Sequence, residues 1–343
     1  MKILIYSTYK YDFVDNIIYS GLVQNLNKND IFLYAQNNNS LPKYADKKAN
    51  IIYGKEILEE LDNFDHIFFF NSAVFDDNFN IVLNKKNSAT KTFFDGIDDF
   101  FIRNIYNHPE ISHYFKRELY NSSIDIGQKF EWGIRYSYNL LKIAKEFNMY
   151  KKWFSYWNMP IGISEEKKFT DIKPFPLTTT LMYNNNRSEK KKTKYHVSFI
   201  GHYNNPERRR YIQFIRHSVR KYKLKSFISA EIIEKSKYFE TIRDSRAGIA
   251  LRGVGRDTWR YWEIPALGTA LISQEVPIDI PNNFIDGESA LFFKNNIELE
   301  EKIRKYIAKS DEWMEISRNG KRHFVKYHTP KERIKKLLEV IGG

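Results

Sequence analysis

Two glycines and three arginines lie between an apolar run and a helical pattern in the second half of the sequence. Arg252, Gly253 and Gly255 directly follow the apolar residues 247–251. Free backbone N–H groups at a helix start, beside glycines that let a ligand approach the chain, form an anion-binding site. Arg252, with Arg256 and Arg260 further along, adds positive charge. The pattern predicts a site for a diphosphate.

The helix that follows carries the other half of this predicted site. Asp257 or Thr258 is expected to cap its first turn. Glu263 lies about one and a half turns into the helix, where a carboxylate can accept both hydroxyls of a ribose. Gly268 ends the helix and allows the turn into the next strand. An ordinary strand–helix–strand unit also ends in glycine and carries surface arginines, so a purely structural role is the alternative.

A second strand end in the same half has similar chemistry. The apolar run 195–200 stops at Gly201, where a ligand could approach the backbone, and a helical pattern then begins at Pro206. Arg208 lies in its first turn. Arg209 and Arg210 are more typical of a helix surface.

These residues need elements to position them, and both halves alternate short apolar runs with helical periodicities. Such alternation predicts βαβ units and parallel sheets. The first half predicts strands and helices, in chain order 2–7, 15–27, 30–35, 50–53, 56–61, 66–71, 91–94 and 136–147. The second predicts 195–200, 206–222, 226–229, 234–243, 247–251, 258–267, 270–273, 289–293, 297–308, 311–327 and 330–341.

Proline and charge clusters interrupt this alternation between about 158 and 194. We therefore expect an α/β protein with two Rossmann-like domains, residues 1–165 and 195–343, joined by a linker at 166–194. The helices predicted at the end of the chain follow the strand–helix alternation of the second domain. We expect them to pack back against the rest of the protein. Ligands of open α/β sheets bind at the carboxyl ends of the strands, so a site facing both domains is the expectation.

Net charge and amino-acid composition limit the classes of protein to which the sequence can belong. The net charge is +13; residues 1–170 hold 21 Lys and Arg against 21 Asp and Glu, and residues 171–343 hold 34 against 21. The basic half suits a phosphate-bearing ligand, although a merely solvated basic face is equally typical. The sequence has no cysteine, which excludes disulfides and cysteine metal sites. No run approaches the roughly 20 apolar residues of a membrane span, so a cytoplasmic protein, at most peripheral at the inner membrane face, is expected.

The segment RYWEIPALG, residues 260–268, resembles the Arg-x-x-Glu-Ala-x-x-x-Gly segment of the GT-B glycosyltransferases. It is most similar to the bacterial group related to the CgeB spore-maturation proteins and, distantly, to exostosin-like enzymes. The stretches VSFIGHY (197–203), FDGIDD (94–99) and YFKRE (114–118) resemble further parts of that group. The first of them, with Arg208 after it, resembles the opening of the donor domain, which implies that Arg208 lies near the donor phosphate. The resemblance implies a nucleotide-sugar donor, UDP- or GDP-linked, in the second domain, with Glu263 on the ribose and Arg260 on the diphosphate. It also implies that the first domain binds the acceptor, and that hexosyl or related transfer proceeds without a metal or other cofactor.

The sequence indicates the residues that would act on the acceptor less clearly than those that would bind the donor. If transfer inverts the anomeric centre, a base is required, and Asp95 and Asp98 follow a predicted strand end. A turn whose aspartates cap the next helix is the alternative, as are His108, His113 and His202 for the base. Asp-x-x-Asp-Asp differs from the Asp-x-Asp metal motif, so no metal site is expected.

Three functions stay open at this stage. The first is transfer to a glycan, lipid-linked or protein acceptor. The second is a DNA-base-modifying glucosyltransferase or other nucleic-acid-binding protein, against which the neutral first half argues, so nucleic acid is not the expected partner. The third is a non-catalytic interaction protein with this fold. The sequence determines neither the donor sugar, the acceptor, the stereochemical outcome nor the oligomeric state.

Overall fold

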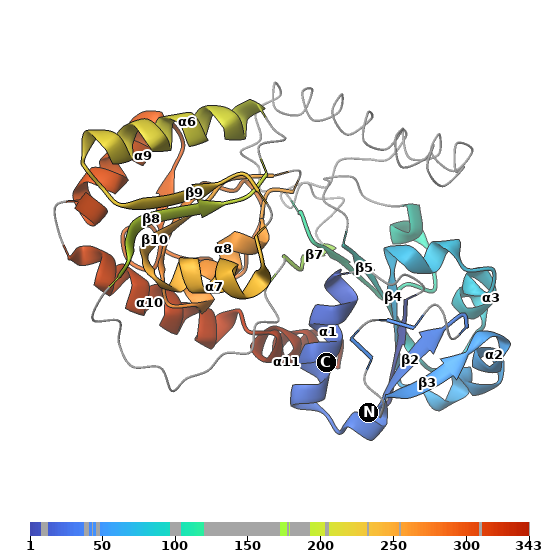
Figure 1. Ribbon diagram of the computed structural model, residues 1–343. Coiled ribbons are helices and arrows are strands. Elements are labelled where there is room, and N and C mark those ends of the chain that lie inside the picture. The colour runs from blue at the N-terminus through green and yellow to red at the C-terminus, as the bar shows by residue number, and fades with distance from the viewer. Residues whose placement is uncertain are drawn as a thin grey trace. The chain divides into compact units, whose positions relative to one another are not determined.

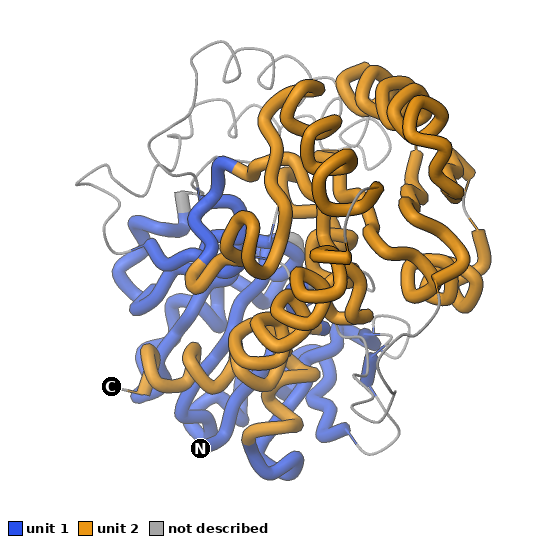
Figure 2. Tube along the Cα trace, turned by 90° about the vertical axis from the view of Figure 1, so that its left-hand side faces the viewer, with its two compact units in different colours: residues 1–16, 26–176, 277–280 blue, residues 17–25, 177–276, 281–343 orange. Residues whose placement is uncertain are grey.

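The computed structural model describes most of the chain and divides it into two compact units (Figure 2). The described residues are 1–7, 13–37, 41–42, 44–45, 49–96, 104–119, 172–176, 178, 193–202, 206–231, 233–253, 255–308 and 311–342. The N-terminal unit comprises residues 1–16, 26–176 and 277–280, and the C-terminal unit comprises 17–25, 177–276 and 281–343. The chain therefore crosses between the units more than once, which the predicted division into consecutive domains did not include.

The N-terminal unit is built on a parallel sheet with strand order β3-β2-β1-β4-β5-β6-β7. Its strands are β1 (Ile3–Tyr6), β2 (Ile31–Ala35), β3 (Asn50–Tyr53), β4 (His66–Phe70), β5 (Thr90–Asp95), β6 (His113–Lys116) and β7 (Ile172–Pro174). Its helices are α2 (Ile57–Glu60) and α3 (Phe79–Asn84), while α1 (Phe13–Asn25) begins in this unit and belongs to the C-terminal unit from residue 17 (Figure 1). The central strand β4 reads HIFFF and is buried along its whole length, as a strand covered on both faces must be.

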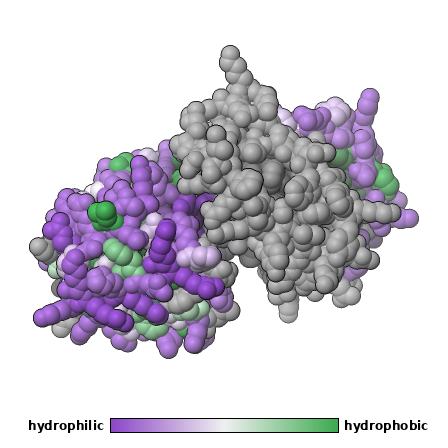
Figure 3. Space-filling view, turned by 90° about the horizontal axis from the view of Figure 1, so that it is seen from above, coloured by the Kyte–Doolittle hydropathy of each residue, from purple (hydrophilic) through white to green (hydrophobic). Residues whose placement is uncertain are grey.

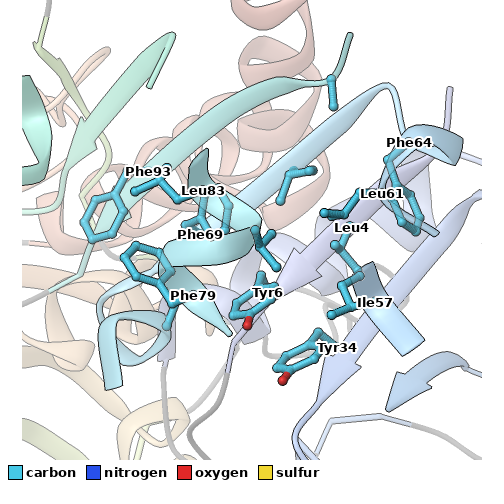
Figure 4. Packing of buried hydrophobic residues seen from close by; sticks show 14 of the residues in the cluster. Leu4, Tyr6, Tyr34, Ile57, Leu61, Phe64, Phe69, Phe79, Leu83 and Phe93 are labelled. Carbon is cyan, nitrogen blue, oxygen red and sulfur yellow. The ribbon is translucent and has the colours of Figure 1, made fainter. Parts of the chain in front are cut away.

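Aromatic side chains fill much of this core (Figure 4). The rings of Tyr6 and Tyr34 stack with centroids 4.1 Å apart. Phe69 packs edge-on against Phe79 of α3, with centroids 5.4 Å apart. The high aromatic content of the chain thus serves the packing of the sheet, in which large rings remove much apolar surface from water.

Two strands of this sheet were not predicted. β6 coincides with residues assigned to a sequence motif, and β7 lies inside the predicted linker. β7 has three residues and ends at Pro174, which lacks an N–H group, so it reads as a loop in sequence. Its place at the edge of the sheet tolerates that proline. The predicted helix 136–147 lies outside the described residues.

The C-terminal unit is built on a parallel sheet with strand order β12-β11-β10-β8-β9. Its strands are β8 (Tyr195–Ile200), β9 (Ser226–Ser229), β10 (Ser245–Ala250), β11 (Ala270–Gln274) and β12 (Leu291–Phe293). Its helices are α6 (Pro206–Lys221), α7 (Lys235–Arg243), α8 (Trp259–Ala266), α9 (Asn296–Lys302), a π-helical segment (Ile303–Ala308), α10 (Glu312–Tyr327) and α11 (Pro330–Ile341). The predicted strands and helices of this half are confirmed, with boundaries shifted by a few residues.

The helices cover both faces of this second sheet. Figure 1 shows α6 and α9 over one face and α7, α8 and α10 over the other. Gly248 of β10 lets α8 approach closely, because a Cβ atom there would lie 2.9 Å from Ile264. Gly268, with φ +70°, ends α8 as predicted. The α/β class with two Rossmann-like halves and C-terminal helices is therefore confirmed.

The face of the C-terminal unit that α6 covers is mainly polar. On α6, four arginines are exposed: Arg209, Arg210, Arg216 and Arg220. Figure 3 shows a mainly hydrophilic described surface with scattered hydrophobic spots on that side. In the part of the chain that the structure describes, no helix is both long and apolar enough to cross a membrane.

Candidate functional site

The order of the strands in the C-terminal sheet reverses at β8. This strand pairs with β9 on one side and with β10 on the other, and β11 and β12 continue beyond β10. The connections leaving β8 and β10 therefore run in opposite directions across the sheet. Ligands of open α/β sheets bind outside the carboxyl ends of the strands at such a switch point. Gly201 follows β8, and Arg252 and Gly253 follow β10, so the sheet brings the two predicted segments to the same edge.

The side chain of Arg208 joins these two strand ends. It is 6% exposed, and its Nη1 donates to the carbonyl of His202 at 3.1 Å. Nε and Nη2 donate to the carbonyls of Arg252 and Leu251, each at 3.1 Å. Burial, followed by the nearby Arg260 cation, lowers the pKa of Arg208 to about 10. Arg208 thus holds the two loops together and places a buried positive charge between them.

Arg260, in the first turn of α8, lies over the end of β8. Its Nη1 donates to the carbonyl of Ile200 at 2.9 Å, and its Cζ is 5.5 Å from the centre of the Phe199 ring. A Cβ atom on Gly201 would lie 2.9 Å from Nη1. Only a residue without a side chain leaves room for this guanidinium, which explains the glycine by packing.

Arg252 is held by two side chains that the sequence analysis did not identify. Its Nη2 donates to Oε1 of Glu207 at 2.7 Å, and its backbone N–H donates to Oε1 of Gln274 at 3.0 Å. The Gln274 amide also donates to Glu207 at 3.0 Å. Burial alone would raise the pKa of Glu207, but Arg252 and Gln274 outweigh it and the pKa is lowered. Glu207 therefore stays charged and fixes Arg252 at the end of β10.

Glu263 lies one turn after Arg260 on α8 and is paired with Tyr238 of α7. The Tyr238 hydroxyl donates to Oε2 of Glu263 at 2.5 Å. Burial raises the pKa of Glu263, while Tyr238, Arg260 and Lys235 act in the opposite direction. Tyr238 is a further residue that the sequence did not single out, since it lies 25 positions before Glu263 on a different helix.

The loop between β10 and α8 contains the remaining predicted donor residues. A Cβ atom on Gly253 would lie 2.8 Å from Nη2 of Arg208, and the Gly253 N–H donates to the Gly255 carbonyl at 3.0 Å. Thr258 is the N-cap of α8, but its side chain makes no capping hydrogen bond. Asp257 is fully buried and accepts from Nε1 of Trp262 at 3.2 Å. Of the two residues that the sequence indicated as candidates for the helix cap, Thr258 holds the N-cap position. Asp257 lies in the core of the C-terminal unit.

On the N-terminal sheet, Asp95 ends β5 as a buried ion pair. Its Oδ2 lies 3.2 Å from Nζ of Lys116, and both side chains are fully buried. The Tyr114 hydroxyl donates to Oδ2 at 2.7 Å and the Asn71 amide donates to Oδ1 at 3.1 Å. Asn71 also accepts from the Gly96 N–H at 2.6 Å. These contacts fix the end of β5 and Gly96. Asp98 and Asp99 lie outside the described residues.

Two histidines that the sequence indicated as alternatives for the base, His113 and His202, lie in different parts of the structure. His113 begins β6, where burial lowers its pKa. His202 follows Gly201, and its carbonyl accepts from Arg208. Within the ranges that the structure describes, no group of three or more His, Asp or Glu side chains has the arrangement of a metal site. The guanidinium groups of Arg208, Arg252 and Arg260 lie at the carboxyl ends of β8 and β10, where their positive charge could act on an anion.

Residues 191–339 match the protein family described as "Glycosyl transferase-like". The match covers the sheet of the C-terminal unit and the helices that follow it. It therefore includes the ends of β8 and β10. No curated protein matches the sequence.

The whole chain is similar to solved glycosyltransferase structures. An alpha-glucosyltransferase in complex with UDP-glucose and DNA containing an abasic site is 10% identical with a TM-score of 0.56, over 99% of this chain and 98% of that one. A glycosyltransferase from Rickettsia africae ESF-5 is 10% identical with a TM-score of 0.57, over 99% and 97%. Alr3699/HepE of Anabaena, in complex with UDP and glucose, is 8% identical with a TM-score of 0.51, over 100% and 99%.

At these identities the likeness shows the fold, which is that of the GT-B glycosyltransferases. Together with the family match, it supports a glycosyltransferase. The narrower resemblance to the CgeB-like and exostosin-related group stays a prediction.

Proposed function

We propose that the protein is a glycosyltransferase that moves a sugar from a nucleotide-sugar donor to a glycan, lipid-linked or protein acceptor. The observation that carries this proposal is the pair of guanidinium groups, Arg208 and Arg260, held at the switch point of the C-terminal sheet. Burial is the main cause of the lowered pKa of Arg208, and repulsion by the nearby Arg260 cation adds to it. A diphosphate at this edge would relieve that repulsion.

The donor diphosphate would lie over the glycine backbone of the two strand ends. Gly201 and Gly253 lack side chains where Arg260 and Arg208 approach them, so a ligand could approach both the backbone and the guanidinium groups there. The α8 N-terminus, with Thr258 as its N-cap, and the backbone of Gly255 add to the same field. Arg252, braced by Glu207, completes the positive edge.

This arrangement suggests how the leaving group is stabilised. Charge develops on the departing diphosphate in the transition state, and fixed cations and N–H dipoles that already point at it lower the barrier. Because Arg208 and Arg260 are held by backbone carbonyls, little reorganisation is needed. We therefore propose transfer that does not require a metal ion.

The ribose of the donor is assigned to Glu263. Its carboxylate is held one helical turn from Arg260, so a nucleotide whose phosphates meet Arg260 would bring its sugar to Glu263. The similar structures contain UDP or UDP-glucose, and UDP-glucose is therefore the first donor to test, with GDP-sugars as the second class.

On the acceptor side, Asp98 is the proposed base and Asp95 supports it. The ion pair of Asp95 with Lys116 and the hydrogen bond from Asn71 fix the end of β5, three residues before Asp98 in the sequence. Asp98→Asn is expected to abolish transfer while donor binding is unchanged. Full transfer by this variant would exclude Asp98 as the base.

Donor binding can be tested with the purified chain by thermal shift and calorimetry against UDP, GDP, CMP and their sugar conjugates. We expect one diphosphate class to raise the melting temperature, because a ligand that binds only the folded state stabilises it. Glu263→Ala should weaken that nucleotide about tenfold, the effect of one lost hydrogen bond to a charged group. Glu300→Ala is the matched control, since Glu300 also accepts from a tyrosine, Tyr222, at 2.6 Å. No shift with any nucleotide would refute the proposal.

One observation favours a DNA acceptor as the second candidate. α6 exposes Arg209, Arg210, Arg216 and Arg220, and such a face suits a phosphate backbone. Two similar structures are alpha-glucosyltransferases in complex with DNA. Duplex binding with a steep dependence on salt, weakened by replacing two of these arginines with glutamine, would support this acceptor. Duplex binding that does not depend on salt, or no binding, would exclude DNA as the acceptor and leave a glycan, lipid-linked or protein acceptor.

A further inference from the structure

Arg333 of α11 places its guanidinium group over the indole ring of Trp262 in α8. Its Cζ lies 4.7 Å from the centre of that ring, within the range in which an aromatic face attracts a cation. Its Nη2 lies 3.2 Å from Nδ1 of His328. A guanidinium group can only donate, so Nδ1 accepts this hydrogen bond. The two contacts fix the side chain of Arg333 on the face of Trp262.

Trp262 connects this arginine to the loop between β10 and α8. The indole is fully buried, and its Nε1 donates to Oδ2 of Asp257 at 3.2 Å. Asp257 is also fully buried, and it directly precedes Thr258, the N-cap of α8. The carboxylate of this loop therefore points into the core of the C-terminal unit, where Trp262 holds it.

Arg333 also acts on Asp257 through its charge. Burial lowers the pKa of Arg333 to about 10, and the negative charge of Asp257 acts in the opposite direction. The two groups therefore attract each other, and such attraction is stronger where water is excluded. A buried carboxylate is costly unless a cation or hydrogen bonds compensate it. Arg333 supplies the cation and Trp262 supplies a hydrogen bond.

The loop held in this way is the one over which the donor diphosphate is proposed to lie. It begins after β10 with Arg252 and Gly253 and ends at Thr258, and Arg260 follows in the first turn of α8. A shift of Asp257 would move the backbone on both sides of it, toward the glycines and toward the helix start. The positions of the groups proposed to meet the diphosphate therefore depend on how Asp257 is held.

We infer that Arg333 is a positioning residue of the donor site, which holds the loop between β10 and α8 through Trp262 and Asp257 in the conformation that receives the diphosphate. The inference rests on the proposed function, in which the donor diphosphate binds over this loop. It gives α11 a role in donor binding, although Arg333 acts on the ligand only through the loop. The effect of Arg333 should therefore fall on the diphosphate part of the donor and not on the nucleoside.

The first experiment compares the affinities of the full chain for UDP and for uridine, which has the same nucleoside and no diphosphate. UDP is titrated by calorimetry, and uridine by ligand-observed NMR, at a temperature where each variant is folded. In Arg333→Met, UDP should bind about tenfold more weakly, as for the loss of one charge-assisted contact, and uridine should bind within about twofold of the wild type. Arg333→Lys keeps the charge but not the planar group, so its UDP affinity should lie between those of the wild type and Arg333→Met. Unchanged UDP affinity in Arg333→Met, or an equal loss for UDP and uridine, would overturn the inference.

Arg246→Met is the matched control, because Arg246 makes the same kinds of contact in another part of the same unit. Its Cζ lies 5.6 Å from the centre of the Trp313 ring, and its Nη1 donates to the carbonyl of Ile307 at 3.1 Å. Arg246 lies near the start of β10, at the opposite end of the strand from the loop. Arg246→Met should lower the midpoint of urea unfolding and leave the affinities for UDP and uridine unchanged. A loss of UDP affinity equal to that of Arg333→Met would show that general destabilisation is the cause, and the specific role of Arg333 would be wrong.

The second experiment is a double-mutant cycle of Arg333→Met and Asp257→Asn, which tests whether the two residues act on UDP binding as one unit. Each single variant removes one of two buried charges that attract each other, and the double variant removes both. The double variant should therefore be more stable than either single variant, which keeps the test available if a single variant does not fold. Its UDP affinity should stay about tenfold below that of the wild type, as in each single variant. Wild-type affinity in the double variant, or a combined loss of about a hundredfold, would overturn the inference.

These outcomes separate the inference from the proposed function. If UDP and GDP both fail to bind the wild type, the proposed function is wrong and the inference falls with it. If the wild type binds UDP and Arg333→Met keeps the same UDP affinity, only the inference is wrong. If GDP binds in place of UDP, the same comparisons are made with GDP and guanosine.

Discussion

The guanidinium group of Arg260 lies against the backbone of Gly201, where a Cβ atom would come within 2.9 Å of Nη1 and 3.0 Å of Cζ. The contact joins the end of β8 to the first turn of α8, which are about 60 residues apart in sequence. A side chain at position 201 would push Arg260 away from the Ile200 carbonyl. The glycine is therefore needed for the arginine's position.

Gly201→Ala should displace Arg260 and weaken nucleotide binding while the fold is kept. Arg260 has a flexible side chain, so the added methyl group moves it at a small cost in stability, about 1 kcal/mol. Calorimetry with UDP or GDP should show an affinity lower by about tenfold, the loss of one charge-assisted contact. Arg220→Ala, which removes an exposed arginine of α6, is the control. Unchanged affinity in Gly201→Ala would contradict the role of this contact.

Asp95→Asn should strongly destabilise the N-terminal unit. The substitution leaves the fully buried Lys116 charge without its carboxylate, and breaking a buried ion pair costs about 3–5 kcal/mol. The midpoint of urea unfolding measures this loss, and Asp95→Asn with Lys116→Met should recover much of it. Asp286→Asn, which breaks a partly exposed pair with Lys302, should cost less than about 1 kcal/mol. Equal losses for the two single variants would contradict the prediction.

His328 should make the C-terminal unit less stable as the pH falls below about 6.5. Burial, then Arg333 and His323, lowers its pKa well below the ordinary value. Between that lowered pKa and 6.5 the unfolded chain binds the proton and the folded chain does not, so unfolding is favoured at lower pH. His328→Gln should remove up to about 1.4 kcal/mol of this loss per pH unit.

The measurement for His328 is urea unfolding of the wild type and the variant at pH 7.0, 6.0 and 5.0. His217→Gln, a substitution on the exposed face of α6, should keep the pH dependence of the wild type. The same slope in His328→Gln as in the wild type would assign the pH dependence to other groups.

Gly268→Ala should lower the melting temperature, because φ is +70° at the end of α8. A residue with a Cβ atom pays about 1–2 kcal/mol in this conformation. The nearest atom to the added carbon is Cδ of Lys321 at 3.2 Å, a flexible side chain that can move, so the backbone dominates the cost. Gly268→Asn should lose less, since asparagine tolerates this region better. A melting temperature for the alanine variant equal to that of the wild type would contradict this account.

Much of the fold was predictable because its signals are local. Buried runs such as HIFFF in β4 and the alternation with helical spacing identify strands and helices within a few residues. Gly268 marks the end of α8 because a left-handed residue is required there. β6 and β7 were missed because they are short, and β7 ends at a proline that resembles a linker.

The candidate site was predictable only in part. The glycines and arginines after β8 and β10 were identified from strand ends, and the structure brings them to one edge through the neighbouring β8 and β10. Glu207, Gln274 and Tyr238 were missed because single polar residues on helices and strands carry no signal in sequence. In the sequence, only the position of Glu207 directly before Arg208 pointed toward its role.

By itself, the sequence determined the α/β class, the two Rossmann-like halves, the glycine-bearing strand ends and the concentration of positive charge in the second half. These follow from interactions between residues close in the chain, and from composition. Only the tertiary structure decided that β8 lies between β9 and β10, that Arg208 joins the loops after β8 and β10, and that Tyr238 holds Glu263. Strand order and cross-helix contacts depend on which faces are buried together, and that choice is made by the whole fold.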